Sequence, residues 1–307
     1  MSHPVREPRH FSIAAAAHGA IEGPGEGLFV STVQIASLMM LASGALHAMV
    51  NAILKSGQDK MSSRALIDGF SALLVLPVAF FVPLPHGAWG WLSGSWATHL
   101  VYLVCLIKAF EATDMSVAYP ILRGVAPALA STVAVLVFHE PINLPVAAGV
   151  ALVSVGVLTV ALGRHVGRAS LGWALATGAT IALYTVVDAQ GVRAAPTAWS
   201  YIVWTYLMLG GGISVLFALW RGPRFLLSAR TEWKPGLIAG AMSVLTYSLA
   251  LYAYRLADVP RLAALRETSI LFATAIAVFI LKEKLTPGRF AGIAGIAAGA
   301  AVLLVSG

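Results

Sequence analysis

The feature that most constrains this chain is a series of ten apolar runs, each about 20 residues or longer. An α-helix of that length spans the hydrocarbon core of a bilayer. Of the 307 residues, 59% are hydrophobic and only 11% are charged, whereas a soluble domain usually carries about 25% charged residues. So few charges cannot cover a water-exposed surface, which excludes a soluble enzyme, a nucleic-acid-binding domain and a disordered chain. The sequence therefore predicts an integral membrane protein.

We expect an all-α fold of ten transmembrane helices joined by short loops, with no extramembrane domain. Residues 1–30 are polar or rich in glycine and proline apart from one short apolar stretch, and no convincing cleavage site follows it. We interpret them as a flexible tail rather than a signal peptide. The predicted spans are residues 33–54, 65–84, 91–110, 115–138, 143–163, 169–189, 197–220, 235–255, 259–281 and 287–306.

The second half of the chain repeats the first. Residues 122–124 (Leu-Arg-Gly) align with 265–267 (Leu-Arg-Glu) at an offset of 143 residues, and residues 47–52 align with 184–189 at an offset of 137. Each repeat contains five spans, an odd number, so the two repeats must cross the membrane in opposite directions. This arrangement is common in secondary transporters, whose binding site lies near the midplane, although duplication alone records only evolutionary history. The predicted repeats are residues 31–165 and 166–307.

Lysine and arginine are concentrated in the odd-numbered loops, which carry twelve of them, against five in the tails and even-numbered loops. The positive-inside rule then places the odd loops in the cytoplasm and both termini outside. The net charge of +7 is explained by these loops and does not indicate a nucleic acid partner.

Charges inside the spans are the strongest functional signal, because an ionisable group in lipid needs a cavity or a partner. Arg123 lies between Pro120 and Pro127. Pro127 has no N–H, so the carbonyl of Arg123 loses its helical donor. We predict a hinge at the two prolines, with unwound backbone and a cavity-facing Arg123 that binds an anion. The alternative is a buried ion pair that locks two helices.

Two polar stripes occupy matching places in the repeats. His47, Asn51 and Lys55 share one face of the first span, and the sixth span carries a stripe of Thr177, Thr180, Tyr184 and Asp188. Stripes at equivalent positions suggest opposite walls of one cavity. Hydrogen bonds between helices are the alternative, which we favour for the two threonines.

In the ninth span, neighbouring residues project about 100° apart, so Arg266 and Glu267 are poorly placed to pair with each other. Asp188 could neutralise one arginine and leave the other for substrate. Two arginines and few aromatic residues in the expected cavity favour a carboxylate- or phosphonate-bearing metabolite. The candidate substrate-binding residues are Arg123, Arg266, Asn51, His47, Tyr184 and Asp188, and the candidate proton-coupling residues are Asp188, Glu267 and His47.

Signals for catalysis are absent. The chain has no His-Glu-x-x-His, no Gly-x-Ser-x-Gly, no P-loop and no Cys/His cluster at metal spacing. The single cysteine, Cys105, cannot form an internal disulfide. We therefore expect no enzymatic activity, no metal and no cofactor.

The detail of the repeats resembles the drug/metabolite transporter superfamily, in the branch built from two EamA-type domains. The resemblance rests on residues 119–127 (Tyr-Pro-Ile-Leu-Arg-Gly-Val-Ala-Pro) leading to 139–141 (His-Glu-Pro), and on 265–271 leading to 282–285 (Lys-Glu-Lys-Leu). It implies a bacterial inner-membrane carrier, often an exporter of amino acids or other small metabolites, working by alternating access without ATP. It also implies cytoplasmic termini, opposite to the charge count.

The sequence therefore predicts a secondary transporter, an exporter of a small polar metabolite, with the lipid bilayer and a small-molecule substrate as its partners and protons as a candidate coupling ion. Two rivals stay open. A membrane scaffold or assembly subunit would use the buried charges as structural pairs, and a flippase for a lipid-linked substrate would need a lateral opening. Substrate identity, direction and oligomeric state are not encoded in these patterns.

Overall fold

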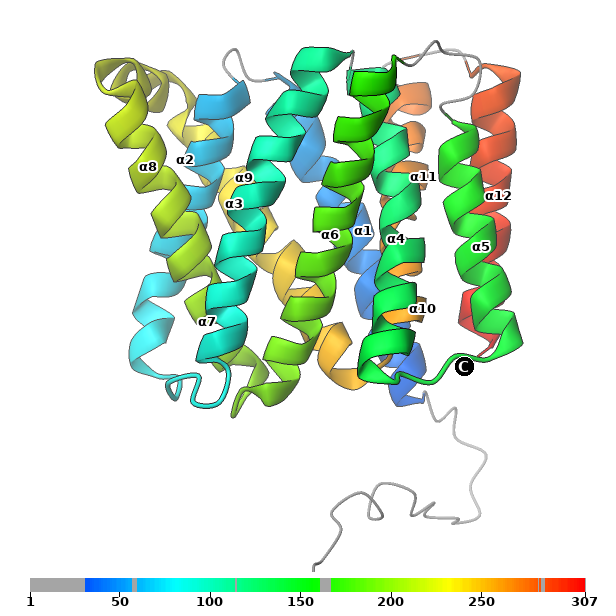
Figure 1. The fold of residues 1–307 in the computed structure, drawn as a ribbon. Helices are drawn as coiled ribbons and strands as arrows, with labels where there is room; N and C mark the ends of the chain where they lie inside the picture. The colour runs from blue at the N-terminus through cyan, green and yellow to red at the C-terminus, as the bar shows by residue number, and fades with distance from the viewer. Residues whose placement is uncertain are drawn as a thin grey trace, which may run out of the picture. The chain divides into compact units, whose positions relative to one another are not determined.

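A computed structural model describes residues 31–306 apart from 57–59, 114, 161–166, 281 and 283–284. Within those ranges every regular element is a helix, and successive helices run up and down (Figure 1). The predicted tail, residues 1–30, lies outside the described residues, as do Glu283 and the side chain of Lys55. The α-helices are α1 (Thr32–Ser56), α2 (Lys60–Val75), α3 (Trp89–Ala112), α4 (Met115–Phe138), α5 (Leu144–Thr159), α6 (Arg168–Ala194), α7 (Ala198–Thr205), α8 (Gly212–Arg221), α9 (Pro223–Leu256), α10 (Val259–Arg266), α11 (Ser269–Ala275) and α12 (Pro287–Val305).

Three irregular segments continue some of these helices. The 3₁₀ segment η2 (Leu76–Phe80) extends α2, the π-helical segment η3 (Tyr206–Gly211) joins α7 to α8, and the π-helical segment η4 (Ile276–Ile280) follows α11. Counted this way, the described residues contain nine helices long and apolar enough to span a membrane, and the apolar α5 is a shorter tenth. The prediction of an all-α, multi-span membrane fold is confirmed.

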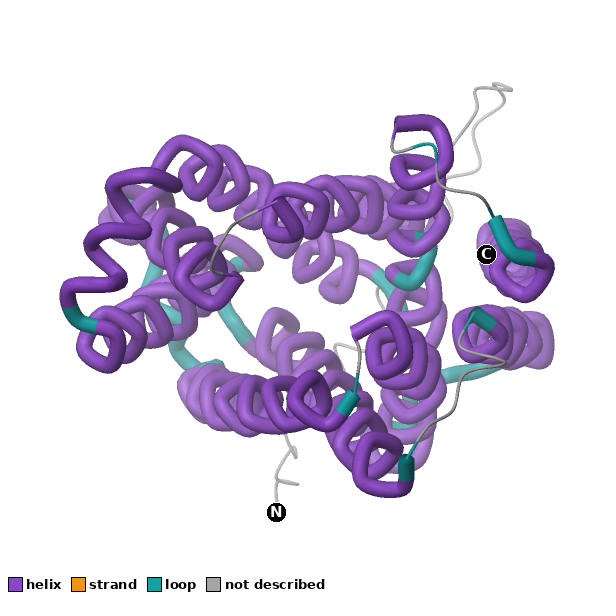
Figure 2. Tube along the Cα trace, turned by 90° about the horizontal axis from the view of Figure 1, so that it is seen from above, coloured by secondary structure: helices purple, strands orange, loops and turns teal. Residues whose placement is uncertain are grey.

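Helices α5 and α12 lie side by side at one end of the described bundle, in both the side view and the view from above (Figures 1 and 2). Both begin at a side-chain cap: Asn143 accepts a hydrogen bond from Val146 N, and Thr286, 143 residues later, accepts one from Arg289 N. A cap of this kind satisfies one of the free N–H groups at a helix start. The two helices therefore start at equivalent points of the two repeats.

Four glycines bring α5 and α12 into close contact. A Cβ atom on Gly149 would lie 3.2 Å from the carbonyl oxygen of Gly299, and one on Gly156 would lie 2.8 Å from that of Gly292. The 143-residue offset carries Gly149 onto Gly292 and Gly156 onto Gly299, so each contact is the counterpart of the other. This reciprocity is what two repeats in opposite orientations require; the exact repeat boundaries stay a prediction.

The helix break lies in the second repeat, at a different place from the one predicted. Helix α4 continues from Met115 to Phe138 through Pro120 and Pro127, so the unwound backbone predicted beside Arg123 is not found. Instead, α10 ends at Arg266 and α11 begins at Ser269, which interrupts the ninth span. Prolines are tolerated inside membrane helices because neighbouring groups and local adjustments compensate for the lost donor. Hinge motion at the two prolines stays a prediction.

Candidate functional site

The Arg123 side chain of α4 reaches the break between α10 and α11. Its Nε atom lies 2.9 Å from Oε2 of Glu267, with both side chains less than a tenth exposed. The N–H is not aimed at that oxygen, so the contact is an ion pair rather than a hydrogen bond. Its Nη2 atom donates to the hydroxyl of Ser269 at 3.1 Å. This geometry matches the alternative in which Arg123 belongs to a buried ion pair.

Arg266 occupies the equivalent place in the second repeat but has different surroundings. None of the four ion pairs found among the described residues involves Arg266, and its buried Nε atom has no hydrogen-bond partner. Its guanidinium carbon lies 5.3 Å from the ring centroid of Tyr247, a favourable cation–π contact. Arg266 is therefore a cation in the core without a described carboxylate partner.

Asp188 of α6 is held by two tyrosines. It accepts a hydrogen bond from the hydroxyl of Tyr201 at 2.8 Å and another from Tyr247, and it is only 1% exposed. The expected neutralisation of one arginine by Asp188 is not found, because none of the described ion pairs involves Asp188 and the carboxylate beside Arg123 is that of Glu267. Tyr247 instead connects the two charges, since its hydroxyl contacts Asp188 and its ring contacts Arg266.

The remaining predicted residues lie on α1 and α6. His47 of α1 lies within electrostatic range of Arg123 and Arg266, because α1 packs against the helix break: a Cβ atom on Gly44 would lie 3.3 Å from Ser269 N. Asn51, one turn further along α1, is half-buried.

Tyr184 of α6 stacks on an aromatic side chain from α3. Its ring centroid lies 4.1 Å from that of His99, and Tyr102 packs edge-on at 5.6 Å. The two threonines of the same stripe donate to backbone carbonyls of their own helix: Thr177 to Trp173 and Thr180 to Thr177. The hydrogen bonds between helices that we favoured for them are therefore not found among the described residues, whereas Tyr184 lies within electrostatic range of Arg266 and Arg123.

A small cavity lies at the centre, with room for roughly one water molecule. Tyr254 is among its lining residues and is 1% exposed, and its side chain interacts with that of Arg266. The cavity is lined by Arg123, Ala126, Pro127, Ala130, Ile181, Thr185, Tyr254, Ala263, Arg266 and Glu267.

The expectation of few aromatic residues near the charges is wrong. Tyr201, Tyr247 and Tyr254 contact the charged residues or line the cavity. Sequence reasoning also missed Asp68 inside the second span, which forms an ion pair with Arg64 at 2.9 Å. Tyr247 and Tyr254 are seven residues apart and so share a helix face, a signal that could have placed both beside the centre. No group of three or more His, Cys, Asp or Glu side chains within the described ranges could hold a metal ion.

Comparisons with known proteins agree with this architecture. Residues 168–305 match the EamA-like transporter family. A solved structure described only as "Crystal structure of protein" superposes with a TM-score of 0.65 at 14% identity, over 88% of this chain and 96% of its own length. At that identity the likeness shows the fold alone. No curated protein matches the chain.

The family match agrees with the ten apolar helices and the charged centre between them. It indicates a multi-pass membrane transporter rather than an enzyme. The resemblance inferred from the sequence motifs is therefore confirmed: residues 168–305 match the EamA-like transporter family, which is part of the drug/metabolite transporter superfamily.

Proposed function

We propose that this protein is a secondary transporter, an exporter in a bacterial inner membrane, for a small metabolite that carries a carboxylate or phosphonate group. Arg266 is the ligand for the anionic group, and the hydroxyl of Tyr254 is a second donor beside it. Arg123, His47, Asn51, Tyr184 and Asp188 complete the polar lining. The central cavity is too small for a metabolite as it stands, so substrate enters only when helices separate, as alternating access requires.

The observation that carries this proposal is the missing partner of Arg266. A cation in the middle of a membrane protein normally has an anionic partner or faces water, because its burial costs several kcal/mol. Arg123 has Glu267 at 2.9 Å, whereas Arg266 has the face of Tyr247 and forms none of the described ion pairs. An anionic substrate supplies the charge that Arg266 lacks. A membrane scaffold has no need of such an unpaired cation.

Tyr254 supports the same substrate class. Tyr254 lines the cavity that Arg266 also lines, and its buried hydroxyl interacts with the Arg266 side chain. Its O–H and the guanidinium N–H groups are all donors, and donors that converge on one space fit an oxyanion. Asp188, with its tyrosine partners, is the acceptor side of a site that fits a zwitterion.

Glu267 offers a route for proton coupling. An anionic substrate that reaches Arg123 competes with Glu267 for the guanidinium. A displaced Glu267 carboxylate, buried without its cation, takes up a proton. Substrate exchange and proton exchange are then linked at one ion pair, with Asp188 and His47 as the other titratable groups of the centre.

The test is ligand binding by thermal shift in detergent, followed by transport in reconstituted vesicles. Wild type, Arg266→Gln and the control Lys108→Gln are screened against amino acids, organic acids and phosphonates. Lys108 is an exposed cation paired with Glu111, so its loss removes one positive charge away from the centre. We expect one anionic class to stabilise wild type and the control, and Arg266→Gln to bind it at least about tenfold more weakly, as loss of a charged hydrogen bond implies. Equal binding by Arg266→Gln, or stabilisation by cations alone, contradicts the proposal.

A further inference from the structure

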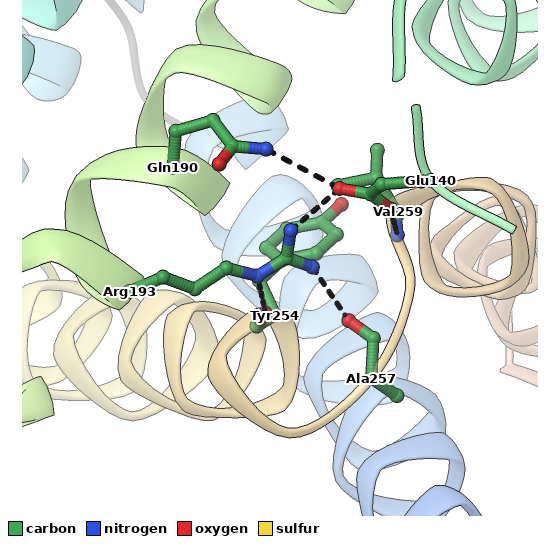
Figure 3. Close-up of polar contacts among 6 residues, drawn as sticks. All are labelled: Glu140, Gln190, Arg193, Tyr254, Ala257 and Val259. Carbon is green, nitrogen blue, oxygen red and sulfur yellow. Dashed lines mark hydrogen bonds and ion pairs between the residues drawn. The ribbon is translucent and has the colours of Figure 1, made fainter. Parts of the chain in front are cut away.

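A second charged network lies away from the cavity, at the face of the bundle where α1 begins and α12 ends (Figures 1 and 3). Its centre is Glu140, in the turn after α4. Oε1 of Glu140 accepts hydrogen bonds from Nη1 of Arg193 at 2.5 Å and from Nε2 of Gln190 at 3.3 Å, and Oε2 accepts one from Val259 N at 2.7 Å. Both carboxylate oxygens of Glu140 therefore accept hydrogen bonds.

Arg193 continues the network to the end of α9. Its Nε atom donates to the carbonyl oxygen of Tyr254 at 2.8 Å, and its Nη2 atom donates to that of Ala257 at 2.9 Å (Figure 3). A guanidinium at the carbonyl end of a helix is favoured by the helix dipole. We call the group formed by Glu140, Gln190, Arg193 and their three backbone partners at Tyr254, Ala257 and Val259 the clasp.

The clasp connects the two repeats across this face. Glu140 comes from the first repeat, and its partners come from the end of α6 and the start of α10, both in the second; Arg193 extends the network to the end of α9. A reciprocal contact reinforces the closure: Arg255, at the end of α9, donates to the carbonyl oxygen of Val192 in the last turn of α6 at 2.7 Å. These contacts hold the helix ends together at the face of the bundle where they lie.

The exposure of Arg193 distinguishes the clasp from the ion pair in the core. The side chain of Arg193 is 27% exposed, against 7% for that of Arg123, whereas Glu140 is as buried as Arg123. Water can therefore replace the partners of Arg193 when the contact opens, whereas opening a fully buried pair leaves bare charges. A contact that opens and closes repeatedly needs partners that water can replace.

Two direct connections join the clasp to the central cavity. Tyr254 accepts from Arg193 with its backbone oxygen and lines the cavity with its side chain. Val259, which donates to Glu140, begins the helix that ends at Arg266. Movement of the clasp therefore shifts the two helices that carry the proposed anion ligands.

We propose that the clasp is a gate that closes the cavity toward the terminus face, and that Glu140 is its latch. The inference rests on the proposed function only in treating the cavity as the transport route. Opening breaks the bonds of Glu140, separates the turn after α4 from α10, and exposes the cavity to that face. The structure described here has the gate closed.

The test measures access to the cavity without any substrate. Ala263, which lines the cavity and is 6% exposed, is replaced by cysteine in a Cys105→Ser background. A membrane-impermeant thiol reagent is then applied from the terminus face in vesicles of known orientation. We expect Glu140→Gln to raise the rate of modification about tenfold, as loss of charge-assisted hydrogen bonds implies, and Gln190→Leu, which removes one long bond, to raise it less.

Glu111→Gln is the matched control, because Glu111 belongs to an exposed ion pair on α3 and its loss should leave the rate unchanged. If Glu140→Gln and Gln190→Leu remain folded and monodisperse but react at the wild-type rate, the clasp is only structural and the gate is refuted. A Glu140→Gln protein that unfolds leaves Gln190→Leu to decide. Because the readout needs no ligand, failure of the gate is distinct from failure of Arg266→Gln to lose binding.

Discussion

Arg123 and Arg266 stand at the same position of two repeats, yet their electrostatic environments differ. Arg123 faces Glu267 and Ser269 across the helix break. Arg266 contacts the ring of Tyr247 and forms no described ion pair, although Glu267 lies within electrostatic range of it. Since the 143-residue offset carries Gly124 onto Glu267, the difference comes from one position: the first repeat has a glycine where the second has the acid. One arginine is paired within the protein, and the other is the proposed ligand for the substrate.

Packing explains why the first repeat has no acid at this position. A Cβ atom on Gly124 would lie 2.7 Å from Cγ of Leu158 and 3.2 Å from its backbone nitrogen. Any side chain there would push α4 away from α5, so the close contact of the two helices requires glycine. Equivalent positions of the two repeats therefore differ in charge where close helix packing allows only glycine in one of them.

The largest expected effect comes from breaking the neutralised pair. Glu267→Gln leaves the Arg123 guanidinium buried without its counter-charge, and we expect it to lower the free energy of unfolding by about 3–5 kcal/mol. Removing both charges, in Arg123→Met with Glu267→Leu, should recover most of that loss. Unfolding in detergent, followed by heat or denaturant, measures both.

Arg266→Met sharpens the same comparison, because it removes a cation that forms no described ion pair. It should change stability far less than Glu267→Gln does. If the two changes destabilise the protein equally, Arg266 has a structural partner after all and the comparison of the two arginines fails.

A smaller effect is expected at the glycine that creates the asymmetry. Gly124→Ala places a methyl group against Leu158, and such overpacking costs about 1–3 kcal/mol. Thermal unfolding of Gly124→Ala checks this, with Gly172→Ala as the control, because nothing lies within 4 Å of a Cβ atom on Gly172. Equal stability of the two variants would show that the contact with Leu158 relaxes easily and does not exclude a side chain at position 124.

The smallest effect concerns a second unequal position, Asp258, whose counterpart by the same offset is Met115. Asp258 lies in the loop before α10, where burial, and secondarily the nearby charge of Glu140, raise the pKa of its carboxyl above the ordinary value. A raised pKa means that the folded protein favours the protonated acid. Ionisation therefore destabilises the fold as pH rises from the ordinary carboxyl range through the raised pKa.

Asp258→Asn should accordingly melt about a degree or two higher than wild type at neutral pH. The difference should vanish in acid, where wild type is protonated as well. Melting curves at several pH values measure this, and a constant difference across the whole range would mean that the charge of Asp258 is not its source. The asparagine keeps the shape of the side chain at the start of α10, so the comparison isolates the charge.

Much of the fold was predictable because its signals are local. Each span can be identified from the length of its apolar run alone, because backbone groups in lipid must form hydrogen bonds within their own helix. The repeats were visible from matching residues such as Arg123 and Arg266. The helix break was misplaced because a proline marks only a lost donor, whereas the actual interruption at Glu267 and Thr268 depends on contacts that α1 and α4 make there.

The sequence by itself determined that this chain crosses the membrane, that it contains two related halves, and which charges must lie inside. Only the tertiary structure decided how those charges are matched. Arg123 binds Ser269 over a separation of 146 residues, and Arg193 binds Glu140 over 53. Hydropathy is a property of each segment, so it can be read along the chain. The partner of a buried charge depends on which helices meet and how closely, and glycines such as Gly124 set that distance only once the helices are packed.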